Sequence, residues 1–504
     1  MSFESGENEV DNGEKIEEKN TENKTDSVVP NKYMKIKKFH FIILIFLIVI
    51  LTTGMTAFVL SFGDEKVVEK IQIQDRKDFT KLYETFESIK ANYIHKVDDK
   101  KLIEGAINGM VESLGDPYSD YMTAKETKEF NETISSSFEG IGAQVEQKDN
   151  NIVIVAPIKG SPAEKAGLKA NDVILEVDGK SIQGMTSNEA VSLIRGKKGT
   201  KVNLKISRPG TSEPIELNIT RDVIPVETVY GEMLDSQIGK IQITTFSERT
   251  YTELVSHINE LKKQGMKGLI LDLRQNPGGL LDQAIDISSL FVPNGKVIYQ
   301  MEKNDGKKVR QLSNQKEPFD IPLVAVVDGG SASASEILAG ALKESAGVPI
   351  VGEKTFGKGT AQTAASYNDG SSLKLTTGKW LTPSGEWINE QGIVPDYEVK
   401  MPDYANLTYI DPSVELKKKS ISEQVSTIEK MLEALGYHPG TIDGAFDDET
   451  EAAVIQFQKD NGLKQTGVVT GETTIQIMEA LRNKLNAEDP QIAKAVELLN
   501  KKIK

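Results

Sequence analysis

One apolar segment divides the chain into two very unequal parts. Phe39 to Phe62 form a run of 24 residues that only small or hydroxyl residues and His40 interrupt. As a helix this run would be about 36 Å long, enough to cross the hydrocarbon core of a bilayer. The sequence therefore predicts one transmembrane helix at residues 39–62. A cleaved signal peptide is the alternative, which the length of the segment and the lack of a good small-x-small cleavage site disfavour.

The charges around this segment predict its orientation. Four lysines between residues 32 and 38 precede it, whereas Asp64 and Glu65 follow it. The positive-inside rule then places the N-terminus in the cytoplasm and everything from residue 63 onward outside. Residues 1–30 carry nine acids against three lysines and almost no large apolar side chains, so we expect residues 1–38 to be a disordered cytoplasmic tail.

The composition excludes several kinds of chemistry. The 504 residues predict several domains. Cysteine is absent, which excludes a disulfide framework, a thiol nucleophile and a cysteine-ligated metal site. The net charge of −15 argues against nucleic acid as the main partner. The acids between Asp443 and Glu451 do not have the spacing of an EF-hand loop, and no metal or cofactor is predicted.

Two glycine-rich motifs carry a candidate nucleophile and base. In the first, an apolar run breaks at Asp328 into small residues around Ser333 and then continues as a helical pattern, which predicts a strand, a tight turn and a helix. In the second, Lys358 lies between two glycines. A serine hydroxyl needs a base to become a nucleophile. A lysine of pKa about 10.4 serves as that base near neutral pH only if burial lowers its pKa, and we expect Phe356 to contribute. Ser331 and Ser335 are candidates for capping or packing.

These motifs resemble those of the carboxyl-terminal processing peptidases, the tail-specific serine proteases of family S41, which use a Ser/Lys dyad. The spacing of 25 residues between Ser333 and Lys358 matches that family, as does a Gln four residues further on. The resemblance implies that Ser333 is the nucleophile, Lys358 the general base and Gln362 the residue that orients the lysine. Whether the charge of Lys354 also acts on Lys358 stays open.

A third motif completes the expected site. The segment Asp-Leu-Arg-Gln-Asn-Pro-Gly-Gly at residues 272–279 resembles the family segment that lends a backbone N–H to the oxyanion hole. The expected donors are the N–H groups of Gly279 and Ala334. None of the four histidines lies in such a motif. We therefore expect no Ser-His-Asp triad, and we interpret His257 as a helix-surface or packing residue.

Residues 136–221 resemble a PDZ domain at two places. Phe138 to Ala143 match its glycine-rich carboxylate-binding loop, and the segment from Ser161 to Gly179 matches its helix, turn and strand. Loop N–H groups would bind a C-terminal carboxylate, an edge strand would pair with the peptide, and a helix would supply apolar contacts. The expected peptide-binding residues are Gly140, Ile141, Gly142, Ala143, Val191, Ile194 and Arg195. Arg195 would sense the bound carboxylate or pair with the protease, or it is simply a cation at a helix C-terminus.

The rest of the exported chain divides into modules. Residues 63–135 read as helices, with a capping box at Thr123 and Glu126, and the resemblance favours a cap or dimerisation role. In residues 222–405 strands alternate with helices, which predicts an α/β core. After a linker at 406–420, residues 421–482 resemble a small helical peptidoglycan-binding domain; a spacer or protein-binding module is the alternative. Residues 483–504 form a last helix, either for dimerisation or as a free tail.

The sequence thus predicts a multidomain protein with a single transmembrane helix, a helical N-terminal segment, a β-rich PDZ domain, an α/β serine protease core and a small helical peptidoglycan-binding-like domain. We interpret it as a serine endopeptidase of the cell membrane, with an extracytoplasmic catalytic domain. The expected partners are proteins with apolar C-termini, the membrane, peptidoglycan and a second copy of the chain. The alternative is a non-catalytic scaffold that localises partners through its PDZ and wall-binding modules.

Overall fold

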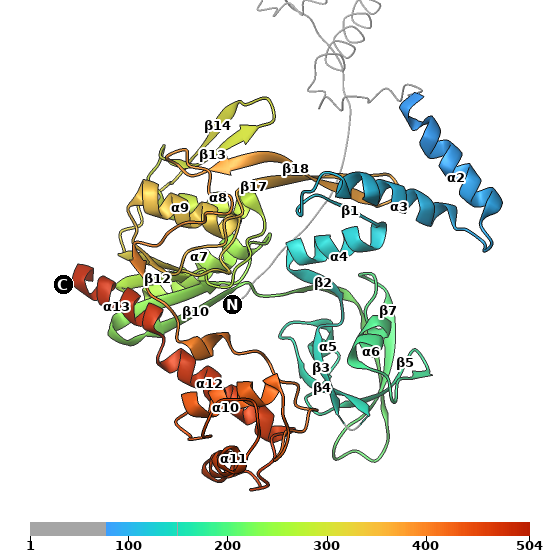
Figure 1. The fold of residues 1–504 in the computed structure, drawn as a ribbon, viewed down its shortest axis with the longest axis vertical. Coiled ribbons are helices and arrows are strands. Elements are labelled where there is room, and N and C mark those ends of the chain that lie inside the picture. Colours follow the sequence, from blue (N-terminus) through green and yellow to red (C-terminus); the bar gives the residue numbers. More distant parts are fainter. Residues whose placement is uncertain (1–76, 149, 504) are drawn as a thin grey trace, which may run out of the picture. The chain divides into compact units, whose positions relative to one another are not determined.

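A computed structural model describes residues 77–148 and 150–503 (Figure 1). The predicted cytoplasmic tail and the predicted transmembrane helix at residues 39–62 lie outside this part of the chain. Within residues 77–148 and 150–503, no helix is both long enough and apolar enough to cross a membrane.

The described chain divides into two units, with the boundary between Val97 and Asp98. The first contains the short 3-10 helix η1 (Lys77–Phe79) and helix α2 (Thr80–Asn92). Helix α2 has the expected helical spacing of apolar residues but buries none of its side chains. Its Leu82 and Tyr83 are exposed.

The second unit begins with residues 98–135, which contribute one strand to an antiparallel sheet. Helix α3 (Asp99–Glu112) is followed by strand β1 (Asp120–Met122) and helix α4 (Ala124–Ser135). Strand β1 pairs antiparallel with β18 (Ser372–Leu381). The predicted capping box of α4 is confirmed, because Thr123 and Glu126 bond each other's backbone N–H groups. Residues 98–135 therefore pack on the α/β core.

The PDZ-like domain forms around one mixed-length antiparallel sheet with strand order β3-β4-β5-β7-β8. Its elements are β3 (Ala143–Lys148), β4 (Asn151–Pro157), α5 (Pro162–Lys165), β5 (Val173–Val177), β6 (Lys180–Ser181), α6 (Ser187–Ile194), β7 (Lys201–Ser207) and β8 (Ile215–Thr220). Strand β3 is an edge of this sheet, so one side of its backbone is open to an added strand. The chain enters through β2 (Ser137–Gly140) and leaves through β9 (Asp222–Pro225), and these two strands pair with each other.

The α/β core is built on a six-stranded sheet of order β10-β11-β12-β15-β16-β19, parallel except for β10. Its strands are β10 (Val229–Leu234), β11 (Ile238–Ile243), β12 (Gly268–Asp272), β15 (Leu323–Val327), β16 (Ile350–Gly352) and β19 (Tyr397–Glu398). The turn η2 (Asp235–Gln237) joins the first two. The predicted α/β alternation is confirmed.

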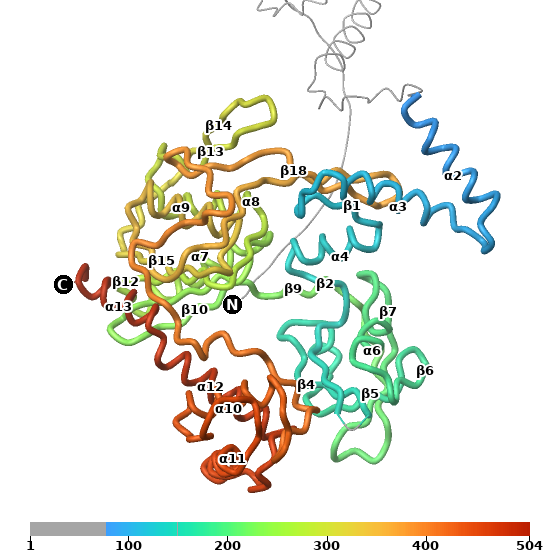
Figure 2. Tube along the Cα trace, in the orientation of Figure 1, coloured from blue at the N-terminus to red at the C-terminus, as the bar shows by residue number. Residues whose placement is uncertain are grey.

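Alternating side chains place helices on both faces of this sheet. Leu269 and Leu271 contribute to one buried cluster with α7 (Thr250–Lys263), α8 (Leu281–Phe291) and α9 (Ala334–Ala346). Ile270 points to the opposite face, as period-2 alternation requires. There it packs against the C-terminal helix α13 (Pro490–Ile503), shown in red beside β12 in Figure 2. The last helix is therefore not a free tail: it covers the sheet of its own chain.

A second, antiparallel sheet lies beside the first. It has the order β1-β18-β13-β14, with β17 also paired to β18. The additional strands are β13 (Val297–Lys303), β14 (Lys308–Leu312) and β17 (Thr360–Ser366). Strand β18 is the central strand of this sheet, and residues 392–396 form a loop before β19.

The C-terminal helical module contains the short η3 (Asp403–Asn406) and helices α10 (Glu423–Ala434), α11 (Asp448–Asp460) and α12 (Glu472–Ala487). Much of the predicted linker at 406–420 belongs to this module. Ile410 and Leu416 are buried in its apolar core, and Leu416 pairs with Val469. The linker prediction rested on composition. It missed the packing of Ile410 and Leu416 because single apolar residues in an irregular segment show neither helical nor strand periodicity.

Candidate active site

Ser333 lies at the tip of the strand-turn-helix motif. It is the residue before α9 and has φ 53° and ψ −111°. Such a backbone conformation is strained for a residue with a Cβ, and strain of this kind collects at functional sites. The two neighbouring serines are buried and bonded, Ser331 Oγ to the Leu273 carbonyl and Ser335 Oγ to the Asn276 carbonyl. Their predicted structural roles are confirmed.

The structure brings the predicted catalytic residues to one cavity of about 490 Å³. Ser333, Lys358, Gln362, Gly279 and Ala334 all line it, and they come from three separate stretches of the chain. The remaining walls are mostly apolar, formed by Phe130, Ile134, Leu280, Leu281, Met301, Ile337 and Trp380 among others. No histidine lines this cavity. His257, on α7, is a half-buried helix residue near Glu260.

The two predicted oxyanion donors are available. Among the described residues, neither the Gly279 N–H nor the Ala334 N–H has a hydrogen-bond acceptor. The Asn276 carbonyl accepts from the Ala332 N–H at 3.0 Å, which joins the glycine loop to the nucleophile turn. A Cβ on Gly278 would lie 2.9 Å from Ser333 Cβ, and one on Gly279 would collide with the Phe246 carbonyl. Glycine is therefore required for this approach.

Burial is the main cause that lowers the pKa of Lys358 below its ordinary value, and the like charge of Lys374 adds to it. Asp116 and Glu336 act in the opposite direction. The Lys358 Nζ lies over the ring of Tyr118, 4.7 Å from its centroid, and has no hydrogen-bond partner among the described residues. One detail of the sequence prediction was wrong, and one question that it left open is answered.

Phe356 does not bury the lysine, since it is 56% exposed. The cation that acts on Lys358 is Lys374 on β18, whereas Lys354 is exposed and is not among the causes of the shift. No local sequence pattern points to Lys374 or Tyr118, because the pairing of β18 with β17 and β1 brings these segments to Lys358.

Gln362 lines the cavity, but its amide does not contact Lys358 in this arrangement. Its Nε2 donates to Thr360 Oγ1 at 3.0 Å and to Thr376 Oγ1 at 3.1 Å. Both threonines lie on the β17–β18 hairpin. The predicted role in orienting the lysine stays a prediction.

Glu336 is a functional candidate that the sequence analysis missed. Its side chain is fully buried on α9, and its carboxylate accepts four hydrogen bonds. Oε2 accepts from the backbone N–H groups of Ser333 at 2.8 Å and Lys358 at 2.9 Å. Oε1 accepts from Thr355 Oγ1 and the Gly357 N–H, both at 2.6 Å. Burial raises the pKa of this carboxyl, and the four donors oppose that shift.

Glu336 is the third residue after Ser333, and an acid at that position was a possible sequence signal for its contact with the nucleophile turn. In a helix N-terminus, such an acid ordinarily bonds only the cap residue. Here the same carboxylate also binds the lysine loop, which no local pattern predicts.

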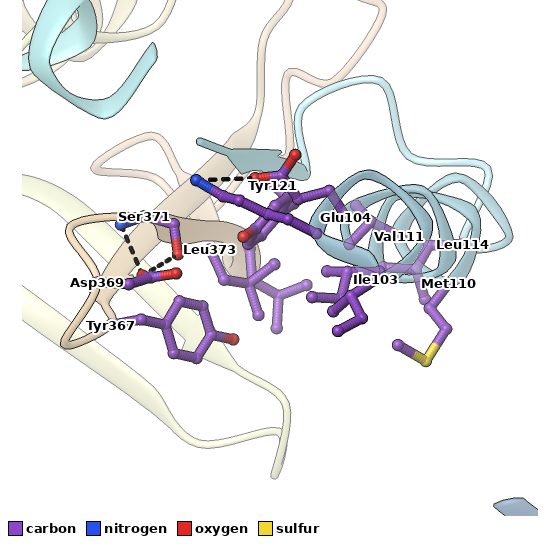
Figure 3. A pocket seen from close by; sticks show the side chains of 13 residues that line it. Ile103, Glu104, Met110, Val111, Leu114, Tyr121, Tyr367, Asp369, Ser371 and Leu373 are labelled. Carbon is purple, nitrogen blue, oxygen red and sulfur yellow. Dashed lines mark hydrogen bonds and ion pairs between the residues drawn. The ribbon is translucent and has the colours of Figure 1, made fainter. Parts of the chain in front are cut away.

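A larger cavity, of about 830 Å³, lies away from Ser333 (Figure 3). Ile103 and Met110 of α3 line it together with Leu373 of β18. Leu373 and Leu375 face this cavity, whereas Lys374 between them faces the catalytic one. The two cavities therefore lie on opposite faces of β18. The one serine that lines the larger cavity, Ser371, belongs to a turn in which both its N–H and its Oγ donate to Asp369 Oδ1, at 3.0 and 2.6 Å.

The predicted peptide-binding residues of the PDZ-like domain do not all face a groove. Ile141 and Ile194 are 4% and 5% exposed and belong to the domain's apolar core, so they are packing residues. Val191 on α6 is half-buried. Gly142, with φ 76°, packs against Ser161, whose Oγ donates to its carbonyl.

The three other predicted residues lie near the start of this domain. Ala143 begins the edge strand β3, and Gly140 ends β2. Arg195 follows α6 and stacks on Phe138, 4.6 Å from the ring centroid. Its guanidinium also lies 3.7 Å from Glu132 of α4. Since Phe130 and Ile134 of α4 line the catalytic cavity, α4 contacts both the PDZ-like domain and the candidate active site.

Residues 237–399 match the model of peptidase family S41. The carboxy-terminal processing protease CtpA of Bacillus subtilis is 50% identical over 467 residues, which are 92% of this chain and 99% of that protein. This chain belongs to the S41 family of carboxyl-terminal processing proteases. The enzyme interpretation is thus confirmed over the non-catalytic scaffold.

Other segments of the protease match models of their own. Residues 153–208 match a PDZ domain, 422–477 a putative peptidoglycan binding domain, and 56–127 the activating protease CtpB N-terminal domain. The carboxy-terminal processing protease CtpB of Bacillus subtilis is 42% identical over 84% of this chain and 89% of its own length. Among solved structures, the photosystem II D1 C-terminal processing protease is 28% identical over 64% of this chain and 94% of that one, with a TM-score of 0.38.

We predict that Glu336→Gln lowers kcat/KM by about 10- to 100-fold. Both carboxylate oxygens of Glu336 accept hydrogen bonds, whereas the glutamine amide has only one acceptor oxygen, and its NH2 group would face donors. Steady-state cleavage of a peptide measures the loss. Glu344→Gln on the same helix is the control, since that carboxylate bonds only the Ser384 N–H. Equal activities of the two variants would contradict the role of Glu336.

A second prediction concerns pH. Lys358 acts as a base only when deprotonated, and its pKa lies below the ordinary 10.5, so kcat/KM should rise with pH through an apparent pKa below that value. Lys374→Met removes a like charge and should move this rise to higher pH, whereas Lys374→Arg should not. Lys379→Met, on the same strand near Trp387, is the control. An unchanged profile for Lys374→Met would contradict the electrostatic role.

Proposed function

We propose that Ser333 and Lys358 cleave the peptide bond, with Gly279 and Ala334 as the oxyanion hole. One observation carries this proposal: a single cavity joins a strained serine, a lysine of lowered pKa and two backbone N–H groups without acceptors. These are the nucleophile, base and oxyanion stabiliser that acyl transfer requires.

The chemistry follows from these roles. Neutral Lys358 removes the proton as Ser333 Oγ attacks the scissile carbonyl carbon, and the oxyanion accepts hydrogen bonds from the two N–H groups. The lysine ammonium then protonates the leaving amine, and the acyl-enzyme forms. Water, activated by Lys358, hydrolyses this ester and regenerates the serine. Gln362 is proposed to orient the lysine during these steps.

Among the described residues no hydrogen bond joins Lys358 Nζ, which lies over the Tyr118 ring, to Ser333 Oγ, so we propose that the lysine side chain moves before it acts as the base. Catalytic hydrogen bonds are often unformed without substrate and tighten in the complex. Tyr118 belongs to the connection between α3 and β1, so a shift of this segment would release the lysine. The arrangement of Lys358 on Tyr118 therefore fits a resting state.

We further propose that the PDZ domain controls this release. A protein C-terminus would add to the edge of β3, with its carboxylate at the loop around Gly142. Val191 favours an apolar tail. Because Arg195 pairs with Glu132 on α4, and α4 lines the catalytic cavity, a carboxylate that draws Arg195 away would free α4 to move.

The surroundings of the protease are part of the proposal. We propose a single-pass protein of the cell membrane with a cytoplasmic N-terminus and an extracytoplasmic catalytic domain, based on residues 32–65 of the sequence. The match to a peptidoglycan binding domain supports cell-wall attachment. A homodimer is supported by the exposed apolar side chains of α2 and the apolar cavity beside α3, surfaces that a second copy would cover.

We predict that Ser333→Ala and Lys358→Ala each abolish proteolysis while the fold is kept, because nucleophile and base act as one unit. Peptide cleavage and thermal unfolding are measured together. Lys354→Ala, in the same motif but exposed, should remain active. A fluorophosphonate should label Ser333 in the wild type. Near-normal activity of either dyad variant would overturn the assignment.

We predict that Arg195→Ala reduces kcat/KM for substrates with a free C-terminus, and that amidating that C-terminus does the same for the wild type. Glu132→Gln should raise basal cleavage of a short peptide, since it weakens the contact between Arg195 and α4. Lys198→Ala is the control, because this exposed cation pairs with Asp222 on β9 instead. If neither Arg195→Ala nor amidation changes kcat/KM, the PDZ domain is not a gate.

We predict that a protease added to intact protoplasts removes the chain beyond residue 63 and spares the N-terminal tail, as the distribution of charges around residues 39–62 implies. Immunoblots with antibodies against each end measure this, and a cytoplasmic protein is the control for leakage. Protection of the catalytic domain would reverse the proposed orientation.

A further inference from the structure

The chain returns from the wall-binding module to the protease at Asp489. This residue starts α13, where its Oδ1 accepts from the backbone N–H groups of Gln491 at 2.9 Å and Ile492 at 3.0 Å. Its other oxygen, Oδ2, lies 2.7 Å from the NH1 of Arg274. One carboxylate thus caps the last helix and pairs with a residue of the catalytic domain 215 positions earlier.

Arg274 is held on several sides. Its Nε and NH2 bind the two oxygens of Asp272 at 2.9 and 2.7 Å, and NH1 also reaches Gln491 Oε1 at 3.0 Å. The Gln491 Nε2 donates to the Val399 carbonyl just after β19. The Arg274 and Asp489 side chains are only 14% and 12% exposed, so water screens this pair less than a surface pair.

Arg274 is also part of the loop that carries the oxyanion donor. Gly279 follows it by five residues, and Gln275, Asn276 and Gly278 between them make hydrogen bonds. The Gln275 N–H and Nε2 bind Asp328, which begins the nucleophile turn, and the Asn276 side chain bonds the Ile243 carbonyl and the Gly278 N–H. Arg274 stands at the start of this loop, where its own backbone N–H donates to Asp272 Oδ1 at 3.1 Å.

We infer that Asp489 and Gln491 are positioning residues of the catalytic site, which act through Arg274 on the loop that presents Gly279. This inference rests on the proposed role of Gly279. It makes α13 a part of the protease and makes the wall-binding module an insertion between β19 and α13. Gln491 then bonds the Val399 carbonyl, just before the module, and Asp489 at its end bonds Arg274 of the catalytic domain.

The chemistry of the pair explains why a positioning role needs the charge. If Asp489 lost its charge, Asp272 would still bind Nε and NH2 of Arg274, but NH1 of this buried guanidinium would lose its anionic partner. A buried charge that loses a partner moves or draws in water. Because the loop is a single turn after β12, a small displacement of Arg274 would shift Gly279 relative to Ser333. Catalytic geometry tolerates little displacement of this kind.

Asp489→Asn in the full-length protein tests this inference. Asn is as good an N-cap as Asp, so the substitution keeps α13 while it removes the charge that holds Arg274. We expect kcat to fall about tenfold, less than for a complete loss of an oxyanion donor. KM and the apparent pKa of the pH profile should not change, because the cavity walls and Lys358 are untouched.

Two further variants complete the experiment. Gln491→Met removes the second bond to Arg274 at similar size and should lower kcat by a smaller factor. Glu497→Gln is the matched control on the same helix, since this exposed carboxylate pairs only with Lys494 and Lys501. It should have the kcat of the wild type. Active-site titration with a fluorophosphonate gives the fraction of competent enzyme for each variant.

The outcomes separate this inference from the proposed function. An unchanged kcat in Asp489→Asn, with Ser333→Ala inactive, overturns the positioning role alone. A kcat loss that vanishes after correction for the titrated fraction, or that is matched by Glu497→Gln, shows a merely structural role and also overturns it. Activity in Ser333→Ala overturns the proposed function beneath it.

Discussion

The buried carboxylate of Glu336 connects the two chain segments that carry the proposed nucleophile and the proposed base. It receives the backbone N–H of Ser333 from the nucleophile turn and those of Gly357 and Lys358 from the lysine loop. Removing a carboxylate from water is costly, and four short hydrogen bonds from donors inside the protein offset that cost. The distance between nucleophile and base is thereby set through backbone atoms, while the Lys358 side chain keeps its freedom to move.

The same arrangement explains how the rest of the α/β core serves the site. The parallel strands β12 and β15 end side by side, and the loops after them carry Gly279 and Ser333. The Asn276 carbonyl and Asp328 hold these loops together. On the opposite face of the sheet, α13 packs on Ile270 and Val326 and reaches the first loop through Arg274. Elements on both faces of one sheet thus contact the loops that carry the proposed oxyanion donors.

Electrostatics gives the site its chemistry without a histidine. Lys358 lies in a largely apolar cavity with a second lysine, and both features favour its neutral form. The neighbouring acids Asp116 and Glu336 act against this shift, so the pKa of Lys358 reflects a balance between burial and Lys374 on one side and the two acids on the other. The ring of Tyr118 offers the charged form a favourable contact away from Ser333. Substrate-dependent movement of this segment would therefore change both the position and the protonation of the lysine.

The sequence by itself determined the local features of this protease. The alternation of strand and helix patterns in residues 222–405 predicted the α/β core, and the glycine motifs marked the turns around Ser333, Lys358 and Gly279. These features follow from backbone preferences and burial within a few residues of each other. The family resemblance added the roles that were assigned to these residues. Neither source predicted the contacts of Gln362 with the threonines of its hairpin.

Only the tertiary structure decided which distant groups meet. Lys374 reaches the cavity through the register of β17 and β18, Glu132 meets Arg195 across two domains, and Asp489 meets Arg274 from beyond an entire module. Ile141 and Ile194 were predicted to face a peptide because they lie on the expected elements, but both are packed into the apolar core of the PDZ domain. A sequence pattern shows that a side chain prefers burial or a charged partner. Strand register and helix packing decide which partner it finds, because they depend on contacts between residues far apart in the chain.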